Sequence, residues 1–155
     1  MGDAEVISWQ LGRPARAVRG VAVRCPYGYP AVTEQEPFAE AGEPFPTAYY
    51  LTCPWLVGSI SRIEAEGGVA RWTEAAAADP VLAQSLERGD AESRRMRPEL
   101  DTGIAGRRNR PLKCLHAHAA FALARPGYEL GERILHEVEE IWCPDARCAR
   151  AQPGG

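Results

Sequence analysis

The chain has 155 residues, 45% of them hydrophobic and 25% charged, with a formal net charge of −3. This size suits one domain that builds its own core, and the weak negative charge gives no general attraction to nucleic acid or to anionic membranes. No apolar run approaches the roughly 20 residues that a membrane span needs, so neither a membrane nor a nucleic-acid partner is expected.

The first residues also lack a basic stretch followed by an apolar one, which is the pattern of a secretory signal. We therefore expect a cytoplasmic protein. Thiols stay reduced in that compartment, so the five cysteines are not interpreted as a disulfide framework.

The first fifty residues favour strands. The segments "VAVRC" (21–25) and "AVTEQ" (31–35) flank the turn-forming "PYGYP" and predict a hairpin with Cys25 at the mouth of its turn. The segment "TAYYLTC" (47–53) predicts a third strand.

After Cys53 the pattern becomes helical, because Pro54 is a natural first helical residue and a stripe of apolar residues follows until Gly67 or Gly68. A helix over 73–87 is predicted, with Thr73 as its N-cap and Pro80 restarting or kinking it. The charged segment 88–111 predicts a short helix with a loop or a partly mobile connection, and further helices are predicted over 112–125 and 129–142.

These elements predict an α+β fold, in which a small N-terminal antiparallel sheet (the hairpin plus one strand) packs against four or five helices. We expect residues 1–142 to form a single domain and residues 143–155 to form a flexible C-terminal tail. Cys143 and Cys148 in that tail could be an additional ligand pair, but their polar surroundings favour exposed thiols.

Cysteine and histidine residues suggest a metal site. Cys114 and His118 are four residues apart in the predicted helix, so one face of the helix would carry both side chains. His116 should point elsewhere, towards a carboxylate or a backbone carbonyl. With Cys25 and Cys53, which both end predicted strands, Cys114 and His118 make a ligand set suited to zinc or iron, although plain burial of the cysteines is an alternative.

Cys53 has a second interpretation. It directly precedes a helix, where unpaired amides and the helix dipole favour a thiolate. If the protein is an enzyme, Cys53 would be the nucleophile and His116 or His118 the base.

The basic segment "GIAGRRNRPLK" (103–113) is a candidate anion site. Arg107, Arg108 and Lys113 lie close to glycines and to a helix N-terminus, which suits a phosphate or carboxylate. The alternative is a solvated loop whose charge is balanced by the acidic region 87–101.

The blocks "VAVRCPYGYPAV", "PFPTAYYLTCPWL", "GIAGRRN" and "KCLHAH" resemble the bacterial family called domain of unknown function 501 (DUF501), from about Gln10 to about Leu135. The resemblance implies a small cytoplasmic bacterial protein with no established activity. In the actinobacterial branch, genes of this family often lie near those for enolase, a septum-formation protein and an exopolyphosphatase. The family motifs contain Cys25, Cys53, Cys114, His116 and His118, which strengthens the metal hypothesis.

Three functions are therefore expected. The first is binding of one zinc or iron ion by Cys25, Cys53, Cys114 and His118. The second is a thiol-dependent enzyme acting on a phosphorylated or carboxylated small molecule. The third is a non-catalytic adaptor in cell division or polyphosphate metabolism, which could bind its protein partner through the amphipathic 129–142 segment. Ordinary core packing is the alternative for that segment, and the sequence favours it.

Overall fold

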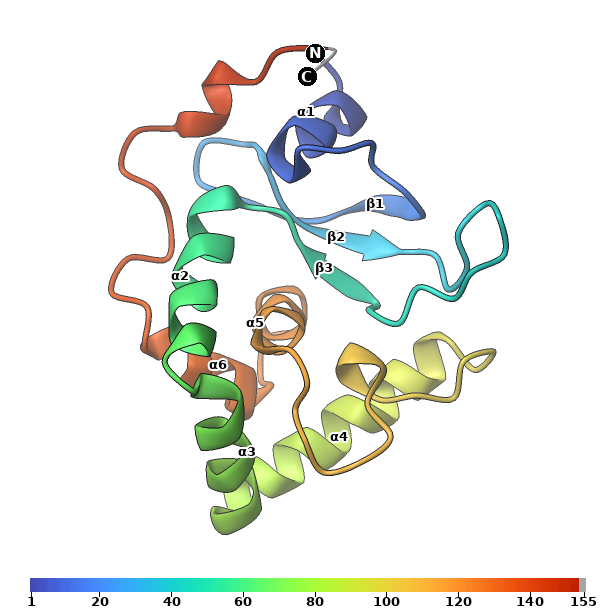
Figure 1. Cartoon of the computed structure of the whole chain (residues 1–155), viewed down its shortest axis with the longest axis vertical. Coiled ribbons are helices and arrows are strands. Elements are labelled where there is room, and N and C mark those ends of the chain that lie inside the picture. The colour runs from blue at the N-terminus through green and yellow to red at the C-terminus, as the bar shows by residue number, and fades with distance from the viewer. Residues whose placement is uncertain (154–155) are drawn as a thin grey trace.

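The computed structural model describes residues 1–153 and contains one antiparallel sheet with the strand order β1–β2–β3 (Figure 1). The strands are β1 (Val18–Arg24), β2 (Pro30–Gln35) and β3 (Tyr49–Leu51). In the hairpin, the Cys25 amide donates to the Tyr29 carbonyl at 2.9 Å and the Gly28 amide donates to the Cys25 carbonyl at 2.9 Å. The expected hairpin is confirmed, with Cys25 at the mouth of its turn.

The helices confirm the α+β class, although six α-helices occur among residues 1–153 where four or five were expected. They are α1 (Asp3–Leu11), α2 (Pro54–Ala65), α3 (Gly68–Ala78), α4 (Pro80–Met96), α5 (Leu115–Ala124) and α6 (Glu129–His136), with 3-10 helices η1 (Ile104–Gly106) and η2 (Arg147–Arg150). Helix α1 was not expected. No helix in this part of the chain is both long and apolar enough to cross a membrane.

The break between α2 and α3 differs from the prediction. Gly67 adopts the left-handed conformation that glycine allows, and α3 begins directly after it. Gly68 is also needed there, because a Cβ at this position would lie 2.6 Å from the Ile63 carbonyl oxygen. Thr73 therefore lies inside α3 and is not an N-cap. Its hydroxyl donates to the Val69 carbonyl and accepts from the Leu112 amide at 3.1 Å, which ties the segment before α5 to α3.

Helix α5 lies at the centre of the fold, between the sheet and helices α4 and α6 (Figure 1). Seven of its ten residues are buried. They contact β3 on one side and α6 on another, and α2 lies alongside. The core therefore forms around α5, as expected for a helix that is apolar all round.

The predicted amphipathic helix 129–142 ends earlier, at His136. Ile134 and Leu135 are buried, and Val138, Ile141 and Trp142 pack against the same core. The face that could have docked a partner therefore belongs mostly to the core.

The C-terminal segment runs back along α2 towards α1 and the hairpin (Figure 1). The Tyr27 hydroxyl donates to the Cys143 carbonyl at 2.8 Å, and Gln10 Nε2 lies 3.3 Å from Cys148 Sγ. Cys143 and Cys148 are buried, so the expectation that they are exposed thiols is wrong. The flexibility of 143–155 stays a prediction.

The contact between α5 and α6 gives a test of the core. A Cβ at Gly131 would lie 2.4 Å from the His118 carbonyl oxygen and 2.6 Å from the Ala122 Cβ, so the helix backbones can approach only because residue 131 is glycine. We predict that Gly131→Ala lowers the free energy of unfolding by about 1–3 kcal/mol in urea denaturation.

Gly58→Ala is the matched control, because Gly58 lies inside α2 and a Cβ there has no neighbour nearer than 4.0 Å. That variant should be as stable as the wild type or up to about 1 kcal/mol more stable, since alanine favours helix. Equal stability of the two variants would contradict the close approach of α5 and α6.

Candidate metal centre

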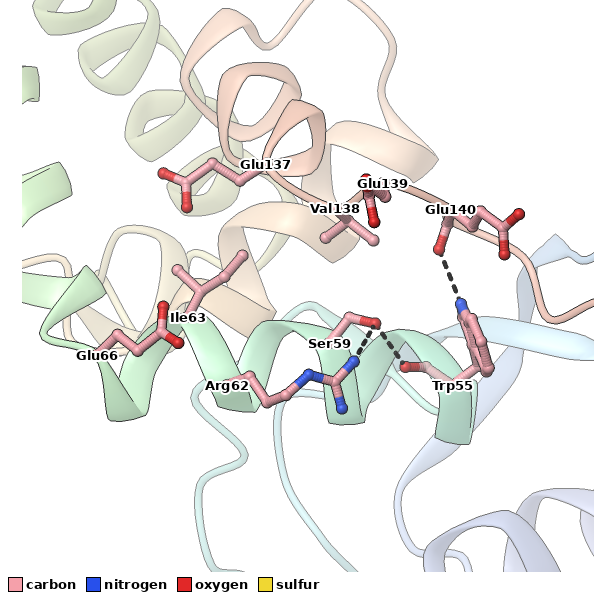
Figure 2. Close-up of a pocket in the computed structure, with 9 residues that line it drawn as sticks. All are labelled: Trp55, Ser59, Arg62, Ile63, Glu66, Glu137, Val138, Glu139 and Glu140. Atoms are coloured by element: carbon pink, nitrogen blue, oxygen red, sulfur yellow. Dashed lines mark hydrogen bonds between the residues drawn. The ribbon is translucent and has the colours of Figure 1, made fainter.

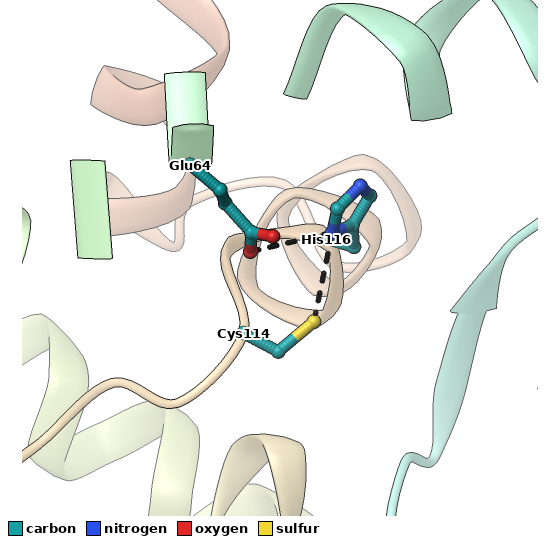
Figure 3. A group of neighbouring side chains, drawn as sticks. All are labelled: Glu64, Cys114 and His116. Carbon is teal, nitrogen blue, oxygen red and sulfur yellow. Dashed lines mark hydrogen bonds and ion pairs between the residues drawn. The ribbon is translucent and has the colours of Figure 1, made fainter. Parts of the chain in front are cut away.

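The structure brings together Glu64 from α2 and Cys114 and His116 from the start of α5 (Figure 3). One ligand atom of each residue lies within 4.8 Å of the others. All three side chains are partly buried. A carboxylate oxygen, a thiol sulfur and an imidazole nitrogen are ligand types that zinc accepts.

Cys114 reaches this group because it precedes α5. It is the N-cap, with an extended backbone, and α5 begins at Leu115. The predicted alignment of Cys114 and His118 on one helix face is therefore wrong, since that alignment required a helix that included both residues.

His116 makes the kind of contacts that were expected of it. Its Nδ1 lies 3.7 Å from Cys114 Sγ and 3.3 Å from Glu64 Oε2. Its Nε2 lies 3.2 Å from the Val57 carbonyl oxygen and 3.0 Å from the Ser61 hydroxyl. Burial lowers the pKa of His116, but Cys114, Glu64 and the Val57 carbonyl together outweigh burial and leave the pKa above its usual value.

Glu64 is held in place by a second contact. Its Oε2 accepts a hydrogen bond from the Leu115 amide at 2.8 Å. This amide is one of the unpaired donors at the N-terminus of α5, so the carboxylate caps the helix and faces His116 at the same time.

A pocket of about 530 Å³ opens beside Cys114 and His116. Residues of α1, β3, α2 and α5 line it, and Arg13 is its only lysine or arginine. No aspartate or glutamate lines it. The Arg13 guanidinium donates to the Tyr50 hydroxyl at 2.8 Å. The pocket therefore presents a thiol, an imidazole and one cation to a bound molecule.

His118 lies away from this group. It is completely buried, its Nδ1 is 2.7 Å from the Tyr128 hydroxyl, and its Nε2 is 3.1 Å from the Leu112 carbonyl oxygen. Burial lowers the pKa of His118 to about 4. Both ring nitrogens have protein partners, so His118 acts here as a hydrogen-bonding core residue.

Cys25 and Cys53 lie in a third place, where they line one small space with Cys143 and Cys148. Cys53 is the N-cap of α2, as predicted. Burial raises its pKa and outweighs the Trp55 and Leu56 amides, which lower it. Burial therefore works against the thiolate expected at Cys53, and Cys53 does not share the pocket of His116.

The basic loop is balanced internally. Arg107 forms a buried ion pair with Asp90 at 2.9 Å and also donates to the carbonyls of Asn109 and Arg110. Arg108 donates to the Leu100 carbonyl at 3.3 Å, and Lys113 lies 3.4 Å from the Gly106 carbonyl. This agrees with the alternative of charge balance by the acidic region 87–101. The Arg107 guanidinium therefore stabilises the loop through Asp90 and the two carbonyls, and these partners occupy the group that was expected to bind an anion.

A larger groove of about 840 Å³ separates α2 from the segment after α6 (Figure 2). Four glutamates and Arg62 line it, and Trp55 Nε1 donates to the Glu140 carbonyl at 2.8 Å. Its lining holds no cysteine and no histidine. Sequence reasoning missed this groove, and the run "EVEE" (137–140) was its only signal.

The role of Arg107 can be tested by stability. We predict that Arg107→Ala lowers the free energy of unfolding by about 3 kcal/mol, because the buried Asp90 carboxylate loses its partner. Arg108→Ala, which removes one hydrogen bond at the surface, should change it by no more than about 0.5 kcal/mol. If urea denaturation shows a similarly small loss of unfolding free energy in both variants, the Arg107–Asp90 ion pair does not stabilise the loop.

The chain was also compared with known proteins. No curated protein and no solved structure matches it. The model of a family described as "protein of unknown function (DUF501)" matches residues 21–102, which are 82 of the 155 residues and include Cys25, Cys53 and Glu64. Since this match spans more than half of its length, the chain belongs to the DUF501 family.

Proposed function

We propose that this protein binds one divalent zinc or iron ion through Glu64, Cys114 and His116. The observation that carries the proposal is the approach of their three ligand atoms to within 4.8 Å of one another. Of the four residues expected to hold the metal, only Cys114 remains in this set. Glu64 was not recognised from the sequence, because it lies 50 residues before Cys114.

The orientation of His116 supports the proposal. The Val57 carbonyl can only accept a hydrogen bond, so it favours the proton on Nε2. The Nδ1 lone pair then faces Cys114 and Glu64. Metal-binding histidines usually donate their other N–H to a carbonyl or carboxylate in this way.

The number of ligands indicates the kind of site. Three protein ligands leave a fourth position of a tetrahedral zinc ion open, which is the arrangement of catalytic rather than structural zinc. The adjoining pocket, which Cys114 and His116 line, would admit a water or a small molecule to that position. Arg13 would attract a phosphate or carboxylate group there, in place of Arg107 and Arg108. The five cysteines are free, which suits a reducing cytoplasm.

Metal content tests the site. We expect His116→Gln to reduce the zinc or iron content by one ion per chain, measured by elemental analysis after purification with reductant and without chelator. Glu64→Gln should weaken binding, because the glutamine side chain can still accept the hydrogen bond from the Leu115 backbone amide but lacks the carboxylate charge.

His136→Gln and Glu66→Gln, at exposed positions, serve as controls and should leave the metal content unchanged. Equal metal content in His116→Gln and the wild type would overturn the proposal.

A second function, thiol chemistry at Cys114, is supported by the 3.7 Å approach of its Sγ to His116 Nδ1. His116 would accept the thiol proton, Val57 would orient the ring through Nε2, and Glu64 would stabilise the imidazolium. Cys114, and not Cys53, would then be the nucleophile.

Alkylation separates this function from metal binding. In chelator-treated protein at pH 7, iodoacetamide should modify Cys114 at least about tenfold faster than the buried cysteines. His116→Gln should remove most of that difference in peptide mapping by mass spectrometry. A Cys114 rate equal to that of free cysteine, and unchanged by His116→Gln, would exclude the nucleophile.

A further inference from the structure

Four of the five cysteines line one small space of about 10 Å³. They come from three distant parts of the chain. Cys25 lies at the mouth of the hairpin, Cys53 caps α2, and Cys143 and Cys148 belong to the C-terminal segment. All four are free thiols, and only Cys25 is more than slightly exposed.

Cysteine sulfurs are the main metal-binding groups that line this space. Its other residues are tyrosines, prolines, one alanine and Arg147, and neither a carboxylate nor a histidine lines it. Gln10 Nε2 lies 3.3 Å from Cys148 Sγ, and Cys53 is the N-cap of α2, beside the unpaired amides of the helix N-terminus. These N–H groups are the donors that thiolates require when they are removed from water.

We propose that Cys25, Cys53, Cys143 and Cys148 bind one Zn²⁺ ion as a closed, structural site, separate from the Glu64–Cys114–His116 group. Four cysteine sulfurs are the ligand set of many structural zinc sites, and four protein ligands leave no open position. Binding would release the four thiol protons. The Arg147 guanidinium and the amides at the N-terminus of α2 would offset the resulting negative charge.

The four cysteines line the same space, but their sulfurs are farther apart than the ligands of one metal ion. Among residues 1–153, no three of them meet the 4.8 Å limit that the Glu64–Cys114–His116 group meets. They nevertheless line one common space, together with Ala146 and Arg147. Zinc binding would therefore require the four side chains to move closer together, and χ1 rotation between staggered rotamers is the movement open to a cysteine side chain.

A zinc ion at this site would stabilise the segment that follows α6. Between α6 and η2 the backbone forms neither helix nor strand. Ala146, between Cys143 and Cys148, adopts the left-handed conformation that alanine seldom takes. Around η2 the segment contacts the rest of the protein through side chains, such as Arg147, whose guanidinium lies over the Trp55 ring at 4.7 Å. A zinc ion would fasten this segment to the hairpin and to α2.

Zinc stoichiometry in a Cys114→Ser background tests the site without a contribution from the Glu64 group. We expect that protein, purified with reductant and without chelator, to hold one zinc per chain, and the added Cys148→Ser or Cys143→Ser change to abolish it. Cobalt loading of Cys114→Ser should give the intense visible bands and the sulfur-to-metal charge transfer of a tetrahedral thiolate site. Failure of the Glu64 proposal would leave these results unchanged, so the two proposals are distinguishable.

A second measurement uses the folded wild-type chain and does not depend on how the variants fold. Chelation of zinc should increase tryptic cleavage after Arg147 and Arg150 by tenfold or more, while cleavage after Arg107, braced by Asp90, stays unchanged. Substoichiometric zinc in Cys114→Ser, or zinc that survives Cys148→Ser, would overturn the proposal. A disulfide among the four cysteines in the reductant-purified protein, seen by intact mass, would overturn it as well.

Discussion

The burial of helix α5 is the constraint on which the rest of the structure depends. A helix that is apolar on all sides cannot lie at a surface, so the sheet, α2 and α6 pack against it, and α4 packs in turn on α6 (Figure 1). Its one completely buried polar side chain, His118, is satisfied by Tyr128 and the Leu112 carbonyl. Gly131 lets α6 approach the backbone of α5. A helix held on every side has little freedom to shift or rotate.

This constraint also positions the candidate metal centre. Since α5 is fixed, its first turn presents Cys114 and His116 to α2 at a defined place. Glu64 meets them because its carboxylate bonds the Leu115 amide at the same helix end. Glu64 and His116 are each held by a further hydrogen bond, which is the arrangement that a preorganised site requires. The neighbouring pocket then gives the group access to small molecules.

Local signals account for what the sequence could predict. The hairpin follows from the turn around Gly28, and the start of α2 follows from Pro54. Helix α1 was missed because it buries only Val6 and Ile7, which is too short a pattern to recognise. Contacts between distant segments could not be predicted. Cys114 appeared to belong to the helix of His118, and nothing near Cys148 indicates that the chain returns to Cys25.

The cysteines separate into two groups, one around His116 and one that joins the hairpin to the C-terminal segment. Anomalous diffraction at the zinc absorption edge, from crystals of zinc-loaded protein, would test this separation most directly. We expect one peak beside His116 Nδ1, with Glu64 and Cys114 as neighbours, and a second peak among Cys25, Cys53, Cys143 and Cys148. A single peak shared by Cys25, Cys114 and His118, or no peak at either place, would contradict it.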